Sequence, residues 1–107
     1  MPRYLFIANY ASEGVKGVLA KGGTARRTAI EKAVTDLGGR MESFDFAFGE
    51  DDVYTIIDVK DNTAAASLAL TVNSDGRTRV RTVVLITPEE IDAAGHQKVS
   101  YAPPGTT

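Results

Sequence analysis

The segment 40–59 constrains the fold of this chain more than any other stretch, because it has the pattern of a β-hairpin. Aromatic and β-branched residues alternate there with a period of two, which is typical of strands. The positions are Phe44, Phe46 and Phe48 in the first half, then Val53, Thr55, Ile57 and Val59 opposite Tyr54 and Ile56. Between the halves, Gly49 and three acidic residues supply turn chemistry. The segment therefore predicts two adjacent strands.

Length and composition limit the classes of protein that this chain can represent. Its 107 residues predict one domain with its own core. The absence of cysteine excludes disulfides and thiolate metal sites, and a single histidine, His96, argues against a histidine-based metal site. A net charge of −2 with mixed signs argues against nucleic acid or an anionic membrane as a partner. No membrane span or secretory leader is predicted, so a cytoplasmic location is expected. No cofactor is expected.

Strands and helices alternate on both sides of the hairpin. Residues 3–10 form a continuous apolar run, which predicts a strand buried on both faces in the middle of a covered sheet. Residues 24–37 carry an apolar stripe at helical spacing, with Thr24 as the predicted cap. The pair Gly38-Gly39 ends this first main helix, as a C-terminal glycine in the left-handed region would.

The second half of the chain repeats this order. Residues 61–73 are rich in alanine and predict a helix that approaches the sheet closely, and residues 77–87 predict a fourth strand. The motif Thr87-Pro88-Glu89-Glu90 predicts a capping box that opens a short helix over residues 88–94. Residues 1–95 are therefore expected to form the domain, and 96–107 an extended tail.

Residues 11–23, which join the first strand to the first main helix, contain four glycines. The spacing of Gly17 and Gly22-Gly23-Thr24 comes near a P-loop, but a glycine stands where the lysine is needed. A nucleotide loop is therefore not predicted. We expect instead a mobile connection with one helical turn around residues 15–19.

The element order β-α-β-β-α-β plus a terminal helix predicts an α+β, ferredoxin-like fold with a four-stranded antiparallel sheet. Its two main helices cover only one sheet face, yet the strands are apolar on both faces. Soluble monomers seldom expose a large apolar patch. A twofold homodimer that packs sheet on sheet would bury it, and a higher assembly stays open.

The sequence also resembles the GYD-domain family over about residues 1–90. The matching features are residues 4–10, Gly14, Leu37-Gly38-Gly39, Ser43-Phe44 and the hairpin residues 49–53. Gly49 and Asp52 of the family's hairpin are present, whereas Asp51 stands in place of its tyrosine, so no role of that tyrosine is carried over. The resemblance implies a dimeric α+β barrel and no particular reaction.

Relatives with the barrel fold implied by this resemblance include cofactor-independent monooxygenases, heme-handling enzymes and isomerases, which work between sheet and helices or inside the barrel. Fold alone does not give function, so the site must come from residues. Four polar side chains on predicted strands form the candidate ligand-binding set: Asn9, Tyr54, Arg79 and Arg81. Converging in an apolar cavity, they would orient an enolate-like or phenolic ligand. The alternative is that Asn9 and Tyr54 are satisfied core polar groups and the arginines a solvated edge.

The hairpin acids Glu50, Asp51 and Asp52 suggest a hard-cation site, but turn chemistry already explains them, and no metal is expected. The predicted function is a homodimeric protein that binds a small molecule or acts as an accessory protein. The alternatives are a monooxygenase- or isomerase-type enzyme and a purely structural module. Residues 98–101 are expected either to cross to the partner subunit or to form a frayed end.

Overall fold

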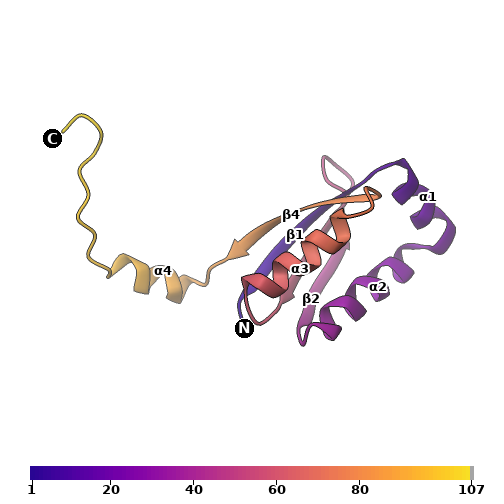
Figure 1. Cartoon of the computed structure of the whole chain (residues 1–107), viewed down its shortest axis with the longest axis horizontal. Coiled ribbons are helices and arrows are strands. Elements are labelled where there is room, and N and C mark those ends of the chain that lie inside the picture. Colours follow the sequence, from indigo (N-terminus) through magenta and orange to yellow (C-terminus); the bar gives the residue numbers. More distant parts are fainter. Residues whose placement is uncertain (107) are drawn as a thin grey trace.

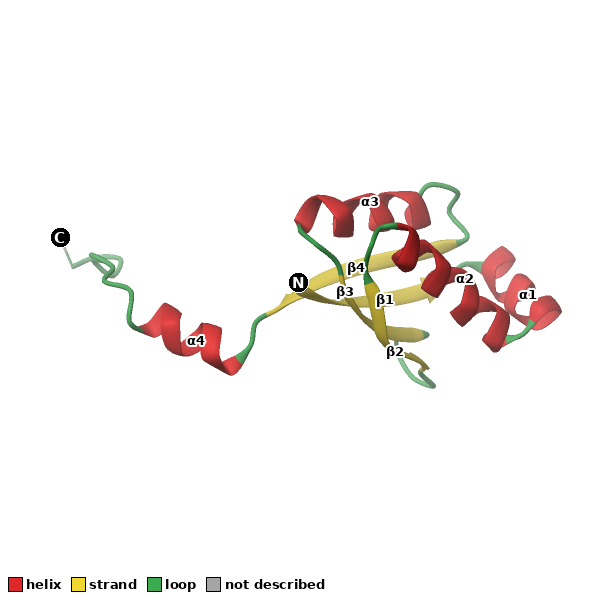
Figure 2. Cartoon of the chain, turned by 90° about the horizontal axis from the view of Figure 1, so that it is seen from below, coloured by secondary structure: helices red, strands yellow, loops and turns green. Residues whose placement is uncertain are grey.

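The computed structural model describes residues 1–106 and shows a four-stranded antiparallel sheet with helices packed on one of its faces (Figures 1 and 2). The sheet order is β2-β3-β1-β4, so the hairpin strands are neighbours and β1 is central. This arrangement confirms the α+β, ferredoxin-like prediction. In chain order the elements are β1 (Arg3–Tyr10), α1 (Ser12–Lys21), α2 (Gly23–Asp36), β2 (Arg40–Phe46), β3 (Val53–Asp58), α3 (Asn62–Asn73), β4 (Thr78–Leu85) and α4 (Pro88–Gly95).

Helix α1 is the largest departure from the sequence prediction, which placed a mobile connection with one helical turn there. The structure has a regular helix of ten residues in this stretch, so that prediction was wrong. Its Gly14 lies so close to the start of β4 that an added Cβ would overlap the carbonyl oxygen of Arg77 and meet the Tyr10 ring. Glycine lowers helix propensity, but here it permits a close tertiary contact that propensity does not measure.

Helix α2 agrees with the prediction except at its start. The residue before its first turn is Gly22, at a φ of +91°, and no side chain caps the helix. The prediction that Thr24 caps it was therefore wrong, because Thr24 lies inside the first turn. The predicted glycine end is confirmed: Gly38 has a φ of +76°, and the amides of Gly38 and Gly39 each bond a carbonyl of the last turn at 2.9 Å.

Side chains cap the other two helices, and the capping box predicted for α4 is confirmed. The Asp61 carboxylate accepts a hydrogen bond from the amide of Ala64 at 2.9 Å and so starts α3. Thr87 and Glu90 form the predicted capping box at the start of α4. These side chains satisfy backbone amides that a helix leaves without partners in its first turn.

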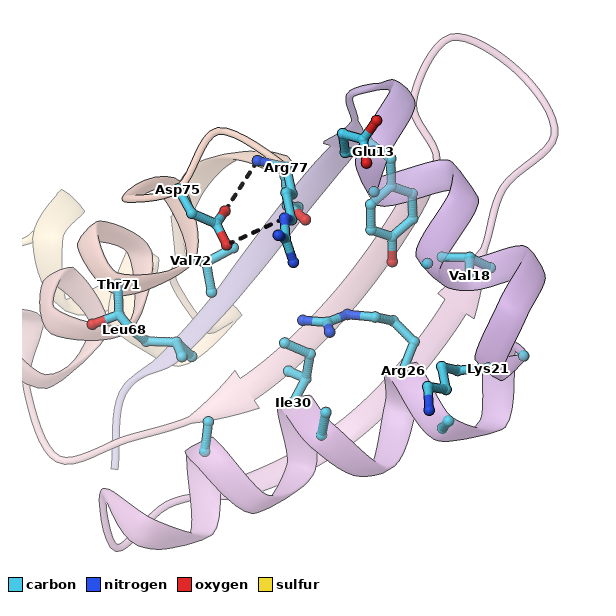
Figure 3. A pocket seen from close by; sticks show the side chains of 18 residues that line it. Glu13, Val18, Lys21, Arg26, Ile30, Leu68, Thr71, Val72, Asp75 and Arg77 are labelled. Carbon is cyan, nitrogen blue, oxygen red and sulfur yellow. Dashed lines mark hydrogen bonds and ion pairs between the residues drawn. The ribbon is translucent and has the colours of Figure 1, made fainter.

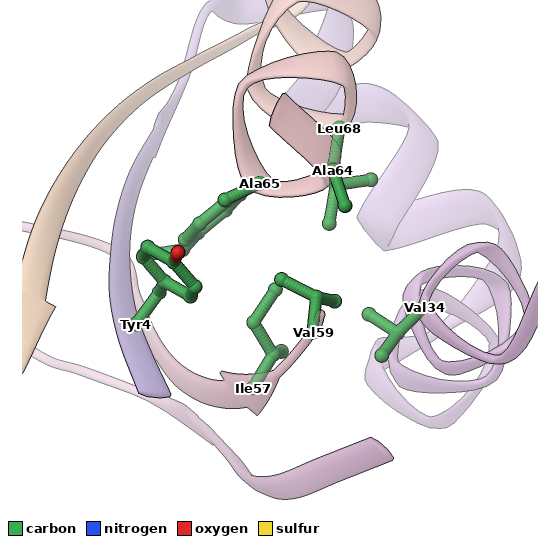
Figure 4. Packing of buried hydrophobic residues seen from close by; sticks show 8 residues of the cluster. Tyr4, Val34, Ile57, Val59, Ala64, Ala65 and Leu68 are labelled. Atoms are coloured by element: carbon green, nitrogen blue, oxygen red, sulfur yellow. The ribbon is translucent and has the colours of Figure 1, made fainter. Parts of the chain in front are cut away.

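The hydrophobic core lies between the sheet and helices α2 and α3 (Figure 4). The alternation predicted for β3 is confirmed, since Val53, Thr55 and Ile57 are buried on the helix side. Antiparallel pairing sets Tyr4 beside Ile57 and so aligns β1 with the same core. The members of the main cluster are Tyr4, Phe6, Val34, Ile57, Val59, Ala64, Ala65 and Leu68.

Beyond β4, helix α4 and the chain that follows it extend away from the domain (Figure 1). This arm makes the described chain 59 Å long and only 33 and 24 Å across. Val99 and Tyr101 are 78% and 73% exposed. The crossing of residues 98–101 to a partner subunit stays a prediction. None of the helices within residues 1–106 has the length and apolarity needed to cross a membrane.

The close approach of the turn after α2 to the end of β3 gives a test of the fold. A Cβ at Gly39 would overlap the carbonyl oxygen of Asp58 and the side chain of Val59. We expect Gly39→Ala to lower the free energy of unfolding by about 2 kcal/mol, because the backbone cannot yield without moving β3. Chemical denaturation measures this change.

The matched control is Gly17→Ala, in the interior of α1, where an added Cβ has no neighbour within 4 Å. That variant should be more stable by about 0.5–1 kcal/mol, because alanine favours helix. Equal effects of the two substitutions would contradict the packing described here.

Candidate functional site

The sheet face opposite the helices has an apolar middle and polar ends. Strand register places Leu5 between Ile56 and Val83 on this face, and Ile7 between Tyr54 and Arg81. At one end, Arg3 pairs with Glu42 at 2.6 Å and Arg40 with Asp58 at 2.8 Å. We call this surface the open face, because none of the helices within residues 1–106 covers it (Figure 2).

Three of the four predicted ligand-binding residues meet at the other end of the open face, around Asp51. The Asp51 carboxylate accepts hydrogen bonds from the side-chain amide of Asn9 at 2.7 Å and from the Tyr54 hydroxyl at 3.1 Å. The Arg81 guanidinium pairs with it at 3.2 Å. We refer to Asn9, Asp51, Tyr54 and Arg81 as the Asp51 cluster; it joins strands β1, β3 and β4 to the hairpin loop.

The electrostatics of the Asp51 cluster stabilise the charged carboxylate. The pKa of Asp51 is lowered, first by the hydrogen bond from Asn9 and further by Tyr54 and Arg81, while burial opposes this shift. The pKa of Tyr54 is raised, first because its hydroxyl donates to Asp51 and then by burial. At neutral pH the cluster therefore consists of an anionic carboxylate and a protonated phenol.

Sequence reasoning missed Asp51 as the centre of this cluster and treated it as a turn residue or a cation ligand. The structure shows that the hairpin loop folds back on β1. The Asp52 amide bonds the carbonyl of Ala8 at 3.0 Å, and the Asp52 carboxylate accepts from the Tyr10 amide at 2.9 Å. The alternating arginines of β4 indicated a nearby carboxylate. The position of that carboxylate, Asp51, depends on the long-range bonds between the hairpin loop and β1.

The remaining predicted residue, Arg79, lies on β4 opposite Asn9 and is exposed. Register places it on the open face together with Arg81, two residues away. It forms no ion pair among residues 1–106. The structure therefore brings Asn9, Tyr54 and Arg81 into contact through Asp51 and leaves Arg79 beside them.

A groove of about 520 Å³ opens on the helix side of the sheet (Figure 3). Helices α1 and α2 form one wall, and α3 with the start of β4 forms the other. Apolar side chains line much of it, among them Val18, Ile30, Leu68 and Val72. The sequence offered no signal for this groove, because the wall formed by α1 was predicted to be a mobile connection.

Several polar side chains line the groove. Tyr10 of β1, Arg26 of α2 and Arg77 before β4 come from three different elements, and the others are Glu13, Lys21, Thr71, Asp75 and Thr78. Figure 3 shows Arg26 and Arg77 extending into it from opposite walls. The pKa of Tyr10 is raised by burial, and the nearby Arg26 guanidinium partly offsets this effect. The Tyr10 phenol therefore stays protonated at neutral pH and is able to donate a hydrogen bond.

The fold and the two polar sites define a ferredoxin-like α+β protein with a groove between its sheet and its helices. The profile of the GYD domain matches residues 4–94. The chain therefore belongs to the GYD-domain family, as the resemblance in its hairpin and first strand implied. None of the curated proteins compared with the chain matches it.

The Asp51 cluster gives a prediction on the pH dependence of stability. Because the pKa of Asp51 is lowered in the folded state, its contribution is present above its ordinary pKa and is lost as pH falls through the folded-state pKa. Asp51→Asn should lower the melting temperature at pH 7, and the difference from the unmodified protein should shrink as the pH falls toward 3.

The control is Glu50→Gln, which removes the neighbouring, exposed carboxylate from the same loop. Its melting temperature should follow that of the unmodified protein at every pH. If Asp51→Asn behaves in the same way, the cluster does not stabilise the hairpin loop. Differential scanning fluorimetry across the pH range is sufficient for the comparison.

Proposed function

We propose that this protein is a homodimer that binds a small organic molecule in the groove between α1–α2 and α3. The groove itself carries this proposal. Its volume, about 520 Å³, falls in the range typical of ligand pockets, about 300–1,000 Å³. A largely apolar lining with a few convergent polar groups is the usual composition of such sites. Tyr10, Arg26 and Arg77 are these convergent groups.

The chemistry of the groove favours binding over a reaction. Its phenol is a donor, since the pKa of Tyr10 is raised. Of the carboxylates at its rim, Glu13 pairs with Lys16 at 3.3 Å and Asp75 accepts from the Arg77 amide at 3.0 Å. Proton abstraction would require a base free to face the ligand. A binding or accessory role is thus better supported than the alternative, a monooxygenase- or isomerase-type enzyme.

The dimer half of the proposal rests on the open face. Leu5, Ile7, Ile56 and Val83 form its middle, and ion pairs occupy its ends. An apolar centre with a polar rim is the usual anatomy of a stable interface. A twofold axis would bury the same patch on both copies, over about 1,200–2,000 Å².

In such a dimer, the Asp51 cluster and Arg79 would face the space between the two sheets. Asn9, Tyr54, Arg79 and Arg81 therefore stay a proposed second ligand-contacting set, inside the barrel. What supports it is the position of the two exposed arginines at the edge of the apolar middle. The cytoplasmic location likewise stays a prediction.

Ligand binding in the groove is tested by filling it. A fragment library is screened against the labelled protein, with amide chemical shifts as the readout, and hits should perturb residues around Val18, Ile30 and Leu68. Ala29→Trp places an indole in the groove from the exposed side of α2 and should abolish these shifts.

Ala20→Trp is the matched control, because Ala20 is exposed on α1 and does not line the groove. It should leave fragment binding unchanged. Fragments that bind only elsewhere, or binding that survives in the Ala29→Trp variant, would refute the groove as the ligand site.

The dimer is tested at Ile56, in the middle of the open face. Light scattering at micromolar concentration should give twice the chain mass. Ile56→Asp would bury an unpaired charge in the interface, at a cost of several kcal/mol, and should weaken the dimer about a hundredfold or more.

Leu70→Asp serves as the control, because Leu70 is 73% exposed on α3, away from the open face. It should not alter the mass. A monomer for the unmodified protein, or an Ile56→Asp variant that dimerises normally, would remove the basis for the proposed interface.

A further inference from the structure

We infer that the ligand of the groove is an amphipathic organic anion: a monocarboxylate with an apolar body. Its carboxylate would lie between Arg26 and Arg77, and its body against Val18, Ile30, Leu68 and Val72. This inference rests on the proposed function, because it names the ligand class of the same groove. Four independent features of the groove support it.

The first feature is the state of the two guanidinium groups. Arg26 is half-buried and forms no ion pair among residues 1–106. Arg77 reaches its only carboxylate partner in that range, Asp75, at 4.0 Å. Both like charges extend into the same groove, Arg26 half-buried and Arg77 with 69% of its side chain exposed (Figure 3). An anion between them would offset their repulsion and form charge-assisted hydrogen bonds with both.

The second feature is the N-terminus of α2, which opens at the edge of the groove through Gly22 and Ala25. No side chain caps this helix, and its first turn contains no acidic residue. Instead, Arg26 and Arg27 follow directly, and cations near a helix N-terminus oppose the helix dipole. A carboxylate at this position would be favoured by the uncapped amides and by Arg26 together.

The third feature is the Tyr10 phenol, half-buried in the groove beside Arg26. Because its pKa is raised, it can donate a hydrogen bond to a bound carboxylate at neutral pH. Phenol and guanidinium would then bind the same anionic head from β1 and α2. The guanidinium has no acceptor for a cationic head group and would repel it.

The fourth feature separates a monocarboxylate from a polyanion. Beyond the two arginines the groove is lined mainly by aliphatic side chains, and Lys21 of α1 is a further, exposed cation in its lining. A second charge on the ligand would lie against the aliphatic side chains unless it reached Lys21, and such burial is unfavourable. An aliphatic or aromatic body would instead bury apolar surface there.

The experiment compares octanoate, 1-octanol and octylamine, which share a chain of eight carbons and differ in head-group charge. Each is titrated into the labelled full chain, with amide shifts of the groove residues as the readout. Octanoate should bind at least about tenfold more tightly than 1-octanol, as expected for a hydrogen-bonded charge. Octylamine should bind most weakly of the three.

Arg26→Gln and Arg77→Gln should each weaken octanoate binding about tenfold and leave 1-octanol unchanged. Arg27→Gln is the matched control: it removes the same charge from the adjacent, exposed position of α2 and should change the affinity less than twofold. Amide spectra of the variants verify that each is folded.

The possible outcomes separate the two proposals. If octanol or octylamine binds the groove as tightly as octanoate, or if Arg26→Gln and Arg27→Gln have equal effects, the anion inference is wrong while the groove remains a binding site. If none of the three compounds shifts the groove amides, the anion inference also fails. The groove itself fails as the ligand site if the fragment screen finds no ligand there or if binding survives in the Ala29→Trp variant.

Discussion

The pairing of β1 with both β3 and β4 is the constraint on which the rest of the structure depends. Ile7 lies opposite Tyr54 on one side and Arg81 on the other, so these two residues flank β1 at one level of the sheet. Asn9 lies two residues further on the same face. This register allows three strands to reach one carboxylate, Asp51, that arrives from the hairpin loop.

The same strand contributes to the groove through its other face. Tyr10 is the last residue of β1, and the chain turns directly into α1. The amide of Ala11 donates to the carbonyl of Arg77 at 2.9 Å, so the start of α1 is fixed to the start of β4. Gly14 permits the approach that follows. The groove therefore exists because one backbone contact and one missing side chain set α1 at a fixed place beside the sheet.

The two sheet faces follow different physical rules. The helix face buries Tyr4, Phe6 and Ile57 in the core, where packing decides stability. The open face keeps charged pairs at both ends, and in its middle Val83 is 39% exposed. This apolar middle would become buried only against another surface. The proposed dimer and the proposed ligand groove thus use opposite sides of one sheet, and neither would obstruct the other.

Local pattern determined the strands, the glycine end of α2, the capping box of α4 and the fold class. Alternation in segment 40–59 and the capping motifs at Asp61 and Thr87 act over a few residues, so they can be recognised in the sequence. Asn9, Tyr54, Arg79 and Arg81 were likewise recognisable as polar groups on strands. The tertiary structure alone decided that Asp51 joins Asn9, Tyr54 and Arg81, and that α1 is a helix. Both depend on contacts between residues distant along the chain: Asp51 with Asn9, and Gly14 with Arg77. The energies of such contacts cannot be inferred from a local sequence pattern.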